Sequence, residues 1–263
     1  MALVKAREYM KSVMNRENSM YILAIETTGA FASVALARDG EVIAQVQGSD
    51  RFSHLQNLAP QIEEVLKKGG QATGEGDKLE IGHMGAIAVS VGPGSFTGIR
   101  IGVATARALS QITGVTCVPV SSLEALAMRP AAKERMLICP ILDARRSQVY
   151  GGGYFMDGAY PVEVIKAGPY TVEEFVDAIK SCDAQYDEVV FVGDGADVYE
   201  EKLKGLIDSR SLPEGNCYQH AEQVAMLAHK LLLEGRNCPY GQLQPNYMRI
   251  AEAERKLKEK QGN

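Results

Sequence analysis

The segment Val89-Ser-Val-Gly-Pro-Gly-Ser-Phe-Thr-Gly-Ile-Arg-Ile-Gly-Val-Ala-Thr-Ala-Arg-Ala-Leu109 joins an apolar strand to a helix through a glycine-rich turn. The apolar run 86–91 is typical of a buried strand, and it ends at Gly92-Pro93-Gly94, where glycine permits backbone shapes that a Cβ would forbid. Ser95 or Thr97 can then cap the helix. Such a turn can present backbone N–H groups to an anion, or it can be a tight connection in an α/β domain. It is neither the P-loop nor the dinucleotide fingerprint.

The composition is that of a globular protein. The 263 residues are 46% hydrophobic and 23% charged, and the chain is long enough for one large domain or two small ones. No apolar run approaches the roughly 18 residues that a membrane span needs. The cysteines include no CxxC pair, which favours a cytoplasmic protein with reduced thiols and without structural zinc. They are Cys117, Cys139, Cys182, Cys217 and Cys238.

The charge distribution argues against a protein that binds nucleic acid alone. The net charge is −5, and the basic excess at the start of the chain leaves the rest more acidic still. Because phosphate contacts supply most non-specific affinity, an acidic body would serve a nucleic acid beside a more basic partner. Residues 1–19 contain no apolar core of secretory-signal length, so we treat them as an extension outside the fold.

Strands and helices are predicted from Tyr21 onward by their hydrophobic period. Asp39-Gly40 is a strong hairpin turn, and Gly69-Gly70 predicts the end of the first helix. The first half contains predicted strands at 21–25, 32–38, 41–47 and 86–91, helices at 53–68 and 97–113, a short strand ending at Val120 and a helix opening at Ser121 or Ser122.

The second half repeats this order. Its predicted strands are 137–142, 148–155, 161–166 and 188–192, and its predicted helices are 171–180 and 196–206. Two tandem βββαβα units predict an α/β protein with two lobes. We place the first lobe at 20–124 and the second at 125–263, including a charged C-terminal tail.

An acid ends the first strand of each unit, Glu26 in one and Asp143 in the other. Paired halves with an acid at each strand tip are the plan of the actin-like, ribonuclease-H-like (ASKHA) folds, which hold a nucleotide and its magnesium between the lobes. Either acid alone is as easily explained as a turn residue. The candidate vestigial nucleotide-binding residues are Glu26, Gly92, Gly94, Asp143, Gly193 and Gly195.

Several motifs make the resemblance specific. They are Ile25-Glu26-Thr27-Thr28, Phe52-Ser53-His54, the glycine segment 91–102, Val118-Pro-Val-Ser-Ser-Leu-Glu-Ala-Leu126, Leu142-Asp-Ala-Arg-Arg-Ser-Gln-Val-Tyr150 and Pro245-Asn-Tyr-Met-Arg249. In this order they resemble the TsaB family, also called YeaZ, over residues 20 to about 256.

The resemblance implies a role in making threonylcarbamoyladenosine, the tRNA modification beside the anticodon. It implies a heterodimer with the catalytic paralogue TsaD, joined by the ATPase TsaE, with tRNA reached through the complex. ATP, magnesium and a catalytic metal are then expected on the partner subunits, and no cofactor on this chain alone. A homodimer using the same surface is a further implication.

The segment 118–126 lacks the paralogue's metal ligands. In TsaD it reads Val-Pro-Val-His-His-Met-Glu-Gly-His, and its second and third histidines, four residues apart on a helix, bind the metal. Such spacing places two ligands on one helix face. Ser122 and Leu126 stand at those two positions here. Leucine offers no lone pair and a neutral hydroxyl is a weak ligand, so we expect no metal site and no catalytic residue in this chain.

The helices 53–68 and 97–113 are richer in apolar and small residues than one buried face requires. Family membership implies that they pack against their counterparts in TsaD, with Arg100 and Arg107 at the rim; the alternative is that they only cover the sheet. The candidate interface residues are His54, Leu58, Ile62, Phe96, Ile99, Arg100, Val103 and Arg107.

Two enzymatic functions compete with the partner-subunit hypothesis. An actin-like ATPase or kinase would use Glu26, Asp143 and the glycine loops at 92–94 and 193–195. A metalloprotease is disfavoured, because the four histidines form no local ligand cluster and Ser95 lies in no GxSxG motif.

Overall fold

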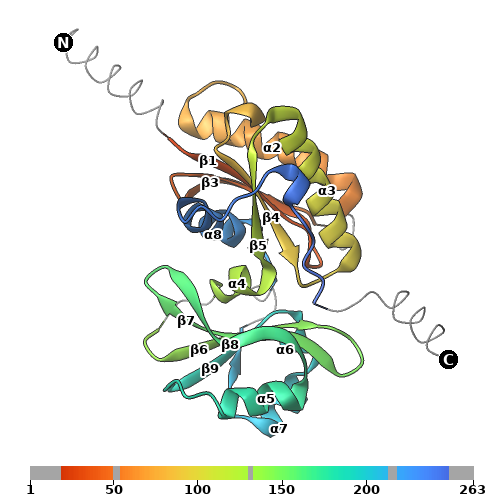
Figure 1. Cartoon of the computed structure of the whole chain (residues 1–263), viewed down its shortest axis with the longest axis vertical. Helices are drawn as coiled ribbons and strands as arrows, with labels where there is room; N and C mark the ends of the chain where they lie inside the picture. Colours follow the sequence, from red (N-terminus) through yellow and green to blue (C-terminus); the bar gives the residue numbers. More distant parts are fainter. Residues whose placement is uncertain (1–18, 50–53, 130–132, 213–217, 249–263) are drawn as a thin grey trace, which may run out of the picture.

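The computed structural model describes residues 19–49, 54–129, 133–212 and 218–248, which form two α/β lobes (Figure 1). The predicted extension 1–19, apart from its last residue, and the charged tail lie outside the described residues. None of the described helices combines the length and the apolar character needed to cross a membrane.

The first lobe contains one five-stranded sheet in the order β3-β2-β1-β4-β5. β1 pairs antiparallel with β2 and parallel with β4. The hairpin between β2 and β3 turns at Asp39 and Gly40, which both have positive φ, as a primed turn requires. The elements are β1 (Tyr21–Glu26), β2 (Ser33–Arg38), β3 (Glu41–Gln47), α2 (His54–Thr73), η1 (Ile81–His83), β4 (Ala86–Gly92), α3 (Phe96–Thr113), β5 (Thr116–Ser121) and α4 (Ser122–Ala127).

The second lobe repeats this topology. Its sheet has the order β10-β9-β6-β7-β8, so each strand occupies the position of its counterpart in the first lobe. Its elements are β6 (Met136–Asp143), β7 (Gln148–Asp157), β8 (Tyr160–Thr171), α5 (Val172–Lys180), β9 (Glu188–Val192), α6 (Asp194–Val198), α7 (Glu200–Leu206) and β10 (Arg210–Ser211). They are followed in the chain by α8 (Ala221–Leu233) and η2 (Tyr240–Gln242). The predicted tandem actin-like, ribonuclease-H-like fold is confirmed by these two sheets of equal order.

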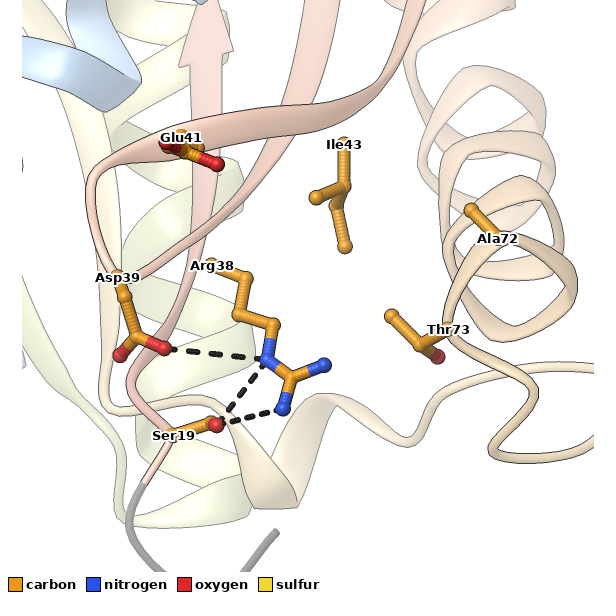
Figure 2. Close-up of a pocket in the computed structure, with 7 residues that line it drawn as sticks. All are labelled: Ser19, Arg38, Asp39, Glu41, Ile43, Ala72 and Thr73. Atoms are coloured by element: carbon orange, nitrogen blue, oxygen red, sulfur yellow. Dashed lines mark hydrogen bonds and ion pairs between the residues drawn. The ribbon is translucent and has the colours of Figure 1, made fainter. Parts of the chain in front are cut away.

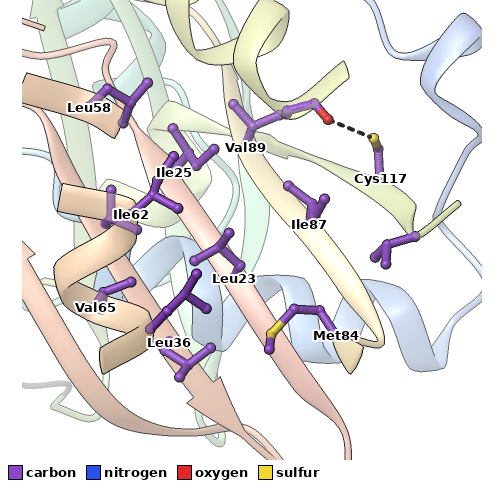
Figure 3. Close-up of a cluster of buried hydrophobic side chains, with 14 of the residues drawn as sticks. Leu23, Ile25, Leu36, Leu58, Ile62, Val65, Met84, Ile87, Val89 and Cys117 are labelled. Atoms are coloured by element: carbon purple, nitrogen blue, oxygen red, sulfur yellow. Dashed lines mark hydrogen bonds between the residues drawn. The ribbon is translucent and has the colours of Figure 1, made fainter. Parts of the chain in front are cut away.

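Both faces of β1 are buried, and alternate residues serve the two faces. Leu23 and Ile25 pack with α2 and α3, whereas Ile22 and Ala24 pack on the opposite side of the sheet. Figure 3 shows the first side, where side chains of α2 approach the strands. A strand that is covered on both faces has a continuous run of apolar residues, and for this reason β1 and β4 can be predicted from the sequence.

α2 continues for one turn beyond the glycine pair that predicts its end. A Cβ at Gly69 would meet the side chain of Leu36, and a Cβ at Gly70 would lie 2.8 Å from the Gly76 carbonyl oxygen. The two glycines therefore allow close packing inside the helix and do not terminate it, so the predicted end at residue 68 was wrong.

The last described α-helix, α8, packs on the first lobe although it follows the second lobe in the chain. Its Leu227 and Leu231 lie in one buried cluster with Ala24 and Ala35 of the first sheet. Figure 1 shows α8 beside that sheet. The predicted assignment of 125–263 to the second lobe is corrected for this helix. A sheet face lined by alanines needs an apolar cover, and the order of elements along the chain does not say which helix supplies it.

α4, which follows the last strand of the first sheet, packs in the opposite direction, on the second sheet. Its Leu123 and Leu126 pack with Ile138 and Val190 of the second sheet, while Ala125 faces the cluster under α8. The opposite face of the second sheet is covered by α5 and α6, whose Phe175 and Ala196 belong to a separate cluster. α8 thus covers a face of the first sheet, and α4 contributes side chains to the buried clusters of both sheets.

Leu227→Ala is expected to lower the free energy of unfolding by about 2–5 kcal/mol, because it leaves a cavity between α8 and the first sheet. Leu233→Ala, at the 67% exposed end of the same helix, should change it by less than about 0.5 kcal/mol. Urea unfolding of both variants measures the difference. Equal effects at the two positions would contradict the packing of α8 on the first lobe.

Candidate functional site

The glycine turn between β4 and α3 is packed against the chain's own backbone on two sides. A Cβ at Gly94 would lie 2.6 Å from the Thr28 carbonyl oxygen, and a Cβ at Gly92 would lie 2.7 Å from the Asn246 carbonyl oxygen. The Ser95 amide donates to Thr28 O (2.8 Å), and the Asn246 amide donates to Val91 O (2.8 Å). The Ser95 hydroxyl caps α3 by accepting from the Gly98 amide at 3.2 Å. This geometry favours a tight connection over an anion cradle.

Glu26, at the end of β1, is completely buried among hydroxyl groups. Its carboxylate accepts from the Thr28 amide (2.5 Å), the Thr28 hydroxyl (2.6 Å) and the Ser90 hydroxyl. Burial raises the pKa of Glu26, and the hydrogen bonds from Ser90 and Thr28 oppose that rise. The Thr28 hydroxyl also lies 3.1 Å from the Ser122 hydroxyl of α4. The network connects β1 and β4 with the helix that crosses to the second lobe.

Asp143, the equivalent acid of the second lobe, organises a tight turn. Its carboxylate accepts from the Arg145 amide (2.8 Å) and the Tyr199 hydroxyl (2.9 Å). Burial, followed by the hydrogen bond to Asp143, raises the pKa of Tyr199 to about 12. Arg145, Arg146 and Ser147 all have positive φ, which L-residues adopt at a cost. The hydrogen bond from the Arg145 amide to the Asp143 carboxylate thus helps to hold residues 145–147 in a backbone conformation that is unfavourable for non-glycine residues.

In the second glycine loop, residues 193–195, the glycines also allow close packing against the backbone of β6. Gly193 has φ 108°, and a Cβ there would collide with the Ile141 carbonyl oxygen; a Cβ at Gly195 would lie 3.0 Å from the same atom. Asp194 accepts from the Asp143 amide (3.0 Å), and burial raises the pKa of Asp194. Among the described residues, no group of three or more histidine, cysteine, aspartate or glutamate side chains is arranged to hold a metal ion.

The candidate interface residues divide into buried and exposed sets. The buried ones belong to the core under α2 and α3, with at most 6% of each residue exposed, and are Leu58, Ile62, Ile99 and Val103. The predicted interface role of Ile99 and Val103 is corrected accordingly, because both are buried in the core, whereas Phe96 of the same helix is exposed. α3 carries apolar residues all round, so its sequence did not indicate which stripe faces the sheet. His54 begins α2, and its side chain lies outside the described set.

Apart from Arg100, which was among the predicted interface residues, the outward face of α3 is formed by residues that sequence reasoning did not select. Arg100, Ala104, Ala108 and Ile112 recur every fourth residue and are all exposed, with Ile112 84% exposed. Their i, i+4 spacing places them on one side of the helix, but the spacing does not show whether that side faces the sheet or the solvent. Apart from the one arginine, these four side chains are apolar, which is unusual for a helix face turned to water.

A second missed feature is the C-terminal strap, residues 236–248, which runs along α3 (Figure 1). Arg107 donates to the carbonyl oxygens of Tyr240 (2.9 Å) and Gly241 (3.3 Å). Arg100 donates to the Tyr247 hydroxyl (3.0 Å) and lies 3.9 Å from the Phe96 ring centroid. Both arginines are therefore fixed by intramolecular contacts, and Phe96, Arg100 and Tyr247 form a preformed aromatic–arginine cluster.

A cavity of about 640 Å³ lies at the β2–β3 turn, lined by the seven residues drawn in Figure 2. Its central cation, Arg38, is engaged by the Ser19 hydroxyl (2.8 and 3.0 Å) and by carboxylates of Asp39 (3.8 Å) and Glu75 (3.9 Å). Arg38 is thus held by intramolecular partners, and the carboxylates of Asp39 and Glu41 line the cavity beside it.

Comparison with known proteins identifies the family. The family model "TsaD: tRNA N6-adenosine threonylcarbamoyltransferase" matches residues 42–257. The chain is 31% identical to the "tRNA threonylcarbamoyladenosine biosynthesis protein TsaB" of Bacillus subtilis, over 92% of this chain and 100% of that protein. It is 30% identical to the TsaB of Escherichia coli, over 90% of this chain and 98% of that protein. The chain belongs to the TsaB family.

A solved structure agrees with the fold. YeaZ from Pseudomonas aeruginosa superposes with a TM-score of 0.71 at 24% identity, covering 87% of this chain and 99% of that one. The structure also places Ser122 and Leu126, the two residues at which the sequence predicts no metal ligand. Ser122 is buried and hydrogen-bonds to Thr28, and Leu126 is buried in the cluster on the second sheet.

The buried carboxyl of Glu26 predicts a pH dependence of stability. Because its pKa is raised in the folded state, its contribution to the free energy of unfolding is fully present below the ordinary value of 4.5 and is lost as the pH rises through the folded pKa. Glu26→Gln retains an acceptor for Thr28 and carries no charge. This variant should lose less stability than the wild type as the pH rises from 4.5 towards neutrality.

The measurement is urea unfolding at a series of pH values. Glu80→Gln, at an exposed position, controls for the loss of one negative charge. A Glu26→Gln profile parallel to that of the wild type would show that this carboxyl does not titrate differently in the two states.

Proposed function

We propose that this chain is a non-catalytic partner subunit that acts with a TsaD-type subunit and the ATPase TsaE in transferring a threonylcarbamoyl group to the adenosine beside the anticodon of tRNAs. The observation that carries the proposal is the burial of two residues of α4, Ser122 and Leu126. Where the catalytic paralogue has two metal-binding histidines, Ser122 and Leu126 are both buried and serve packing and hydrogen bonding. ATP, magnesium and the catalytic metal then belong to the partner subunits, and the complex works in the cytoplasm.

The outward face of α3 is the proposed docking surface for the TsaD-type subunit. Ala104 and Ala108 allow another helix to approach closely, and Ile112 offers an apolar anchor. The cluster of Phe96, Arg100 and Tyr247 lies at one end of this face, and arginine and aromatic residues dominate binding energy at interfaces. A homodimer of the isolated chain would use the same face, and tRNA would be bound through the complex.

Ala104→Glu is expected to weaken binding to the TsaD-type subunit by at least about 100-fold, because it buries an unpaired carboxylate in the interface. The variant should remain as stable as the wild type, since Ala104 is exposed. Val103→Glu, at the adjacent buried position, should instead destabilise the fold. Isothermal titration calorimetry and urea unfolding of both variants separate the two effects.

Val198→Glu provides the matched surface control, because Val198 is 58% exposed on the second lobe. It should bind the partner as the wild type does. Wild-type affinity in Ala104→Glu would place the docking surface elsewhere.

The function itself is tested by reconstitution. The purified chain is mixed with its cognate TsaD-type subunit, TsaE, ATP and unmodified tRNA, and threonylcarbamoyladenosine is measured with and without the chain. Modification should depend on the chain and should be lost with Ala104→Glu. Full modification without the chain would remove the proposal, and so would tight binding and turnover of magnesium-ATP by the chain alone.

A further inference from the structure

Cys117 of β5 and Cys238 of the C-terminal strap face each other in an isolated antiparallel bridge. The Cys117 amide donates to the Cys238 carbonyl oxygen (2.9 Å), and the Cys238 amide donates to the Cys117 carbonyl oxygen (2.8 Å). The Thr116 hydroxyl donates to the same Cys238 carbonyl oxygen (3.1 Å). These bonds fix the register of the strap, so the two cysteines are directly opposite each other.

This register brings the two side chains together. Directly opposed residues that exchange both hydrogen bonds have Cα atoms about 5.5 Å apart, within the range of about 4.4–6.8 Å that disulfides span. Opposed side chains lie on the same face of a sheet, and Cys117 and Cys238 accordingly pack in the same core cluster. Both are free thiols, Cys117 buried and Cys238 partly exposed. The Cys117 sulfur lies 3.9 Å from the Ala106 carbonyl oxygen, a contact that a rotation about χ1 can release. Figure 3 marks the interaction of the Cys117 sulfur with a dashed line.

We propose that Cys117 and Cys238 form a reversible disulfide that fastens the C-terminal strap to β5. The oxidant is a small-molecule disulfide such as oxidised glutathione. The thiolate of the more accessible Cys238 attacks one glutathione sulfur, forming a mixed disulfide and releasing one reduced glutathione. The thiolate of Cys117 then attacks the Cys238 sulfur and displaces the second reduced glutathione. Two protein thiols and one oxidised glutathione thus give one protein disulfide and two reduced glutathiones.

The position of the bridge determines what the disulfide would restrain. Downstream of Cys238, the strap makes its contacts with α3 through Tyr240 and Tyr247, and with β4 through Asn246. A covalent bond at Cys238 anchors the beginning of this segment. Any effect of the disulfide on binding at the outward face of α3 rests on the proposed function. The formation of the disulfide and its restraint of the strap do not rest on it.

The first experiment maps the disulfide in the folded full-length chain. The chain is incubated with oxidised glutathione, free thiols are alkylated, and proteolytic peptides are analysed by mass spectrometry. The expected result is a linked pair of peptides containing Cys117 and Cys238, reversed by reduced glutathione. Cys238→Ser should abolish this pair, and Cys182→Ser, in the second lobe, should leave it intact. Oxidation that stops at a mixed disulfide on Cys238, or that links only other cysteines, would overturn the proposal.

The second experiment measures the restraint by hydrogen exchange. In the oxidised chain the amides of Cys238 and Asn246, which bond to Cys117 and Val91, should exchange at least about tenfold more slowly than in the reduced chain, a change well within the usual contribution of a disulfide. Amides of α5, remote from the bridge, provide the internal control. Unchanged exchange in the strap, with the disulfide formed, would show that the cross-link restrains nothing.

Discussion

The buried carboxyl of Glu26 connects three elements on which the lobe junction depends. Removing a carboxylate from water is costly, and it is tolerated only where donors replace the lost hydration. Thr28 and Ser90 supply those donors, and Ser122 extends the network to α4. Because α4 packs on the second sheet, a network at the tip of β1 fixes where the second lobe begins. The carboxyl group of Glu26 is thus fully engaged in intramolecular hydrogen bonds.

The exchange of helices follows from the need to cover both faces of each sheet. The first sheet has α2 and α3 on one face and alanines on the other, and α8 returns from the second lobe to bury them. α4 covers the second sheet in the opposite direction. After α8, the strap continues over the first lobe and reaches the glycine turn through Asn246. The glycines of that turn are required by two backbone approaches, one from the β1–β2 loop and one from the strap.

The two sides of α3 separate stability from association. The inward side, with Ile99 and Val103, belongs to the core, and the small residues Gly98 and Gly102 allow Thr27 to pack against the helix. The outward side carries alanines and a highly exposed isoleucine. The strap adds Tyr247 beside Phe96 and Arg100, so a segment distant in sequence becomes part of the same surface.

The sequence by itself determined the repeated strand and helix order, because buried strands and amphipathic helices leave local periods that do not depend on the rest of the fold. It also determined that residues 122 and 126 are serine and leucine, neither of which is a strong metal ligand. Only the tertiary structure decided that α8 covers the first sheet, that Val103 faces inward while Ala104 faces outward, and that Cys117 is opposite Cys238. These are relations between segments far apart in the chain or between faces of equal polarity, and hydrophobic patterning carries no information about either.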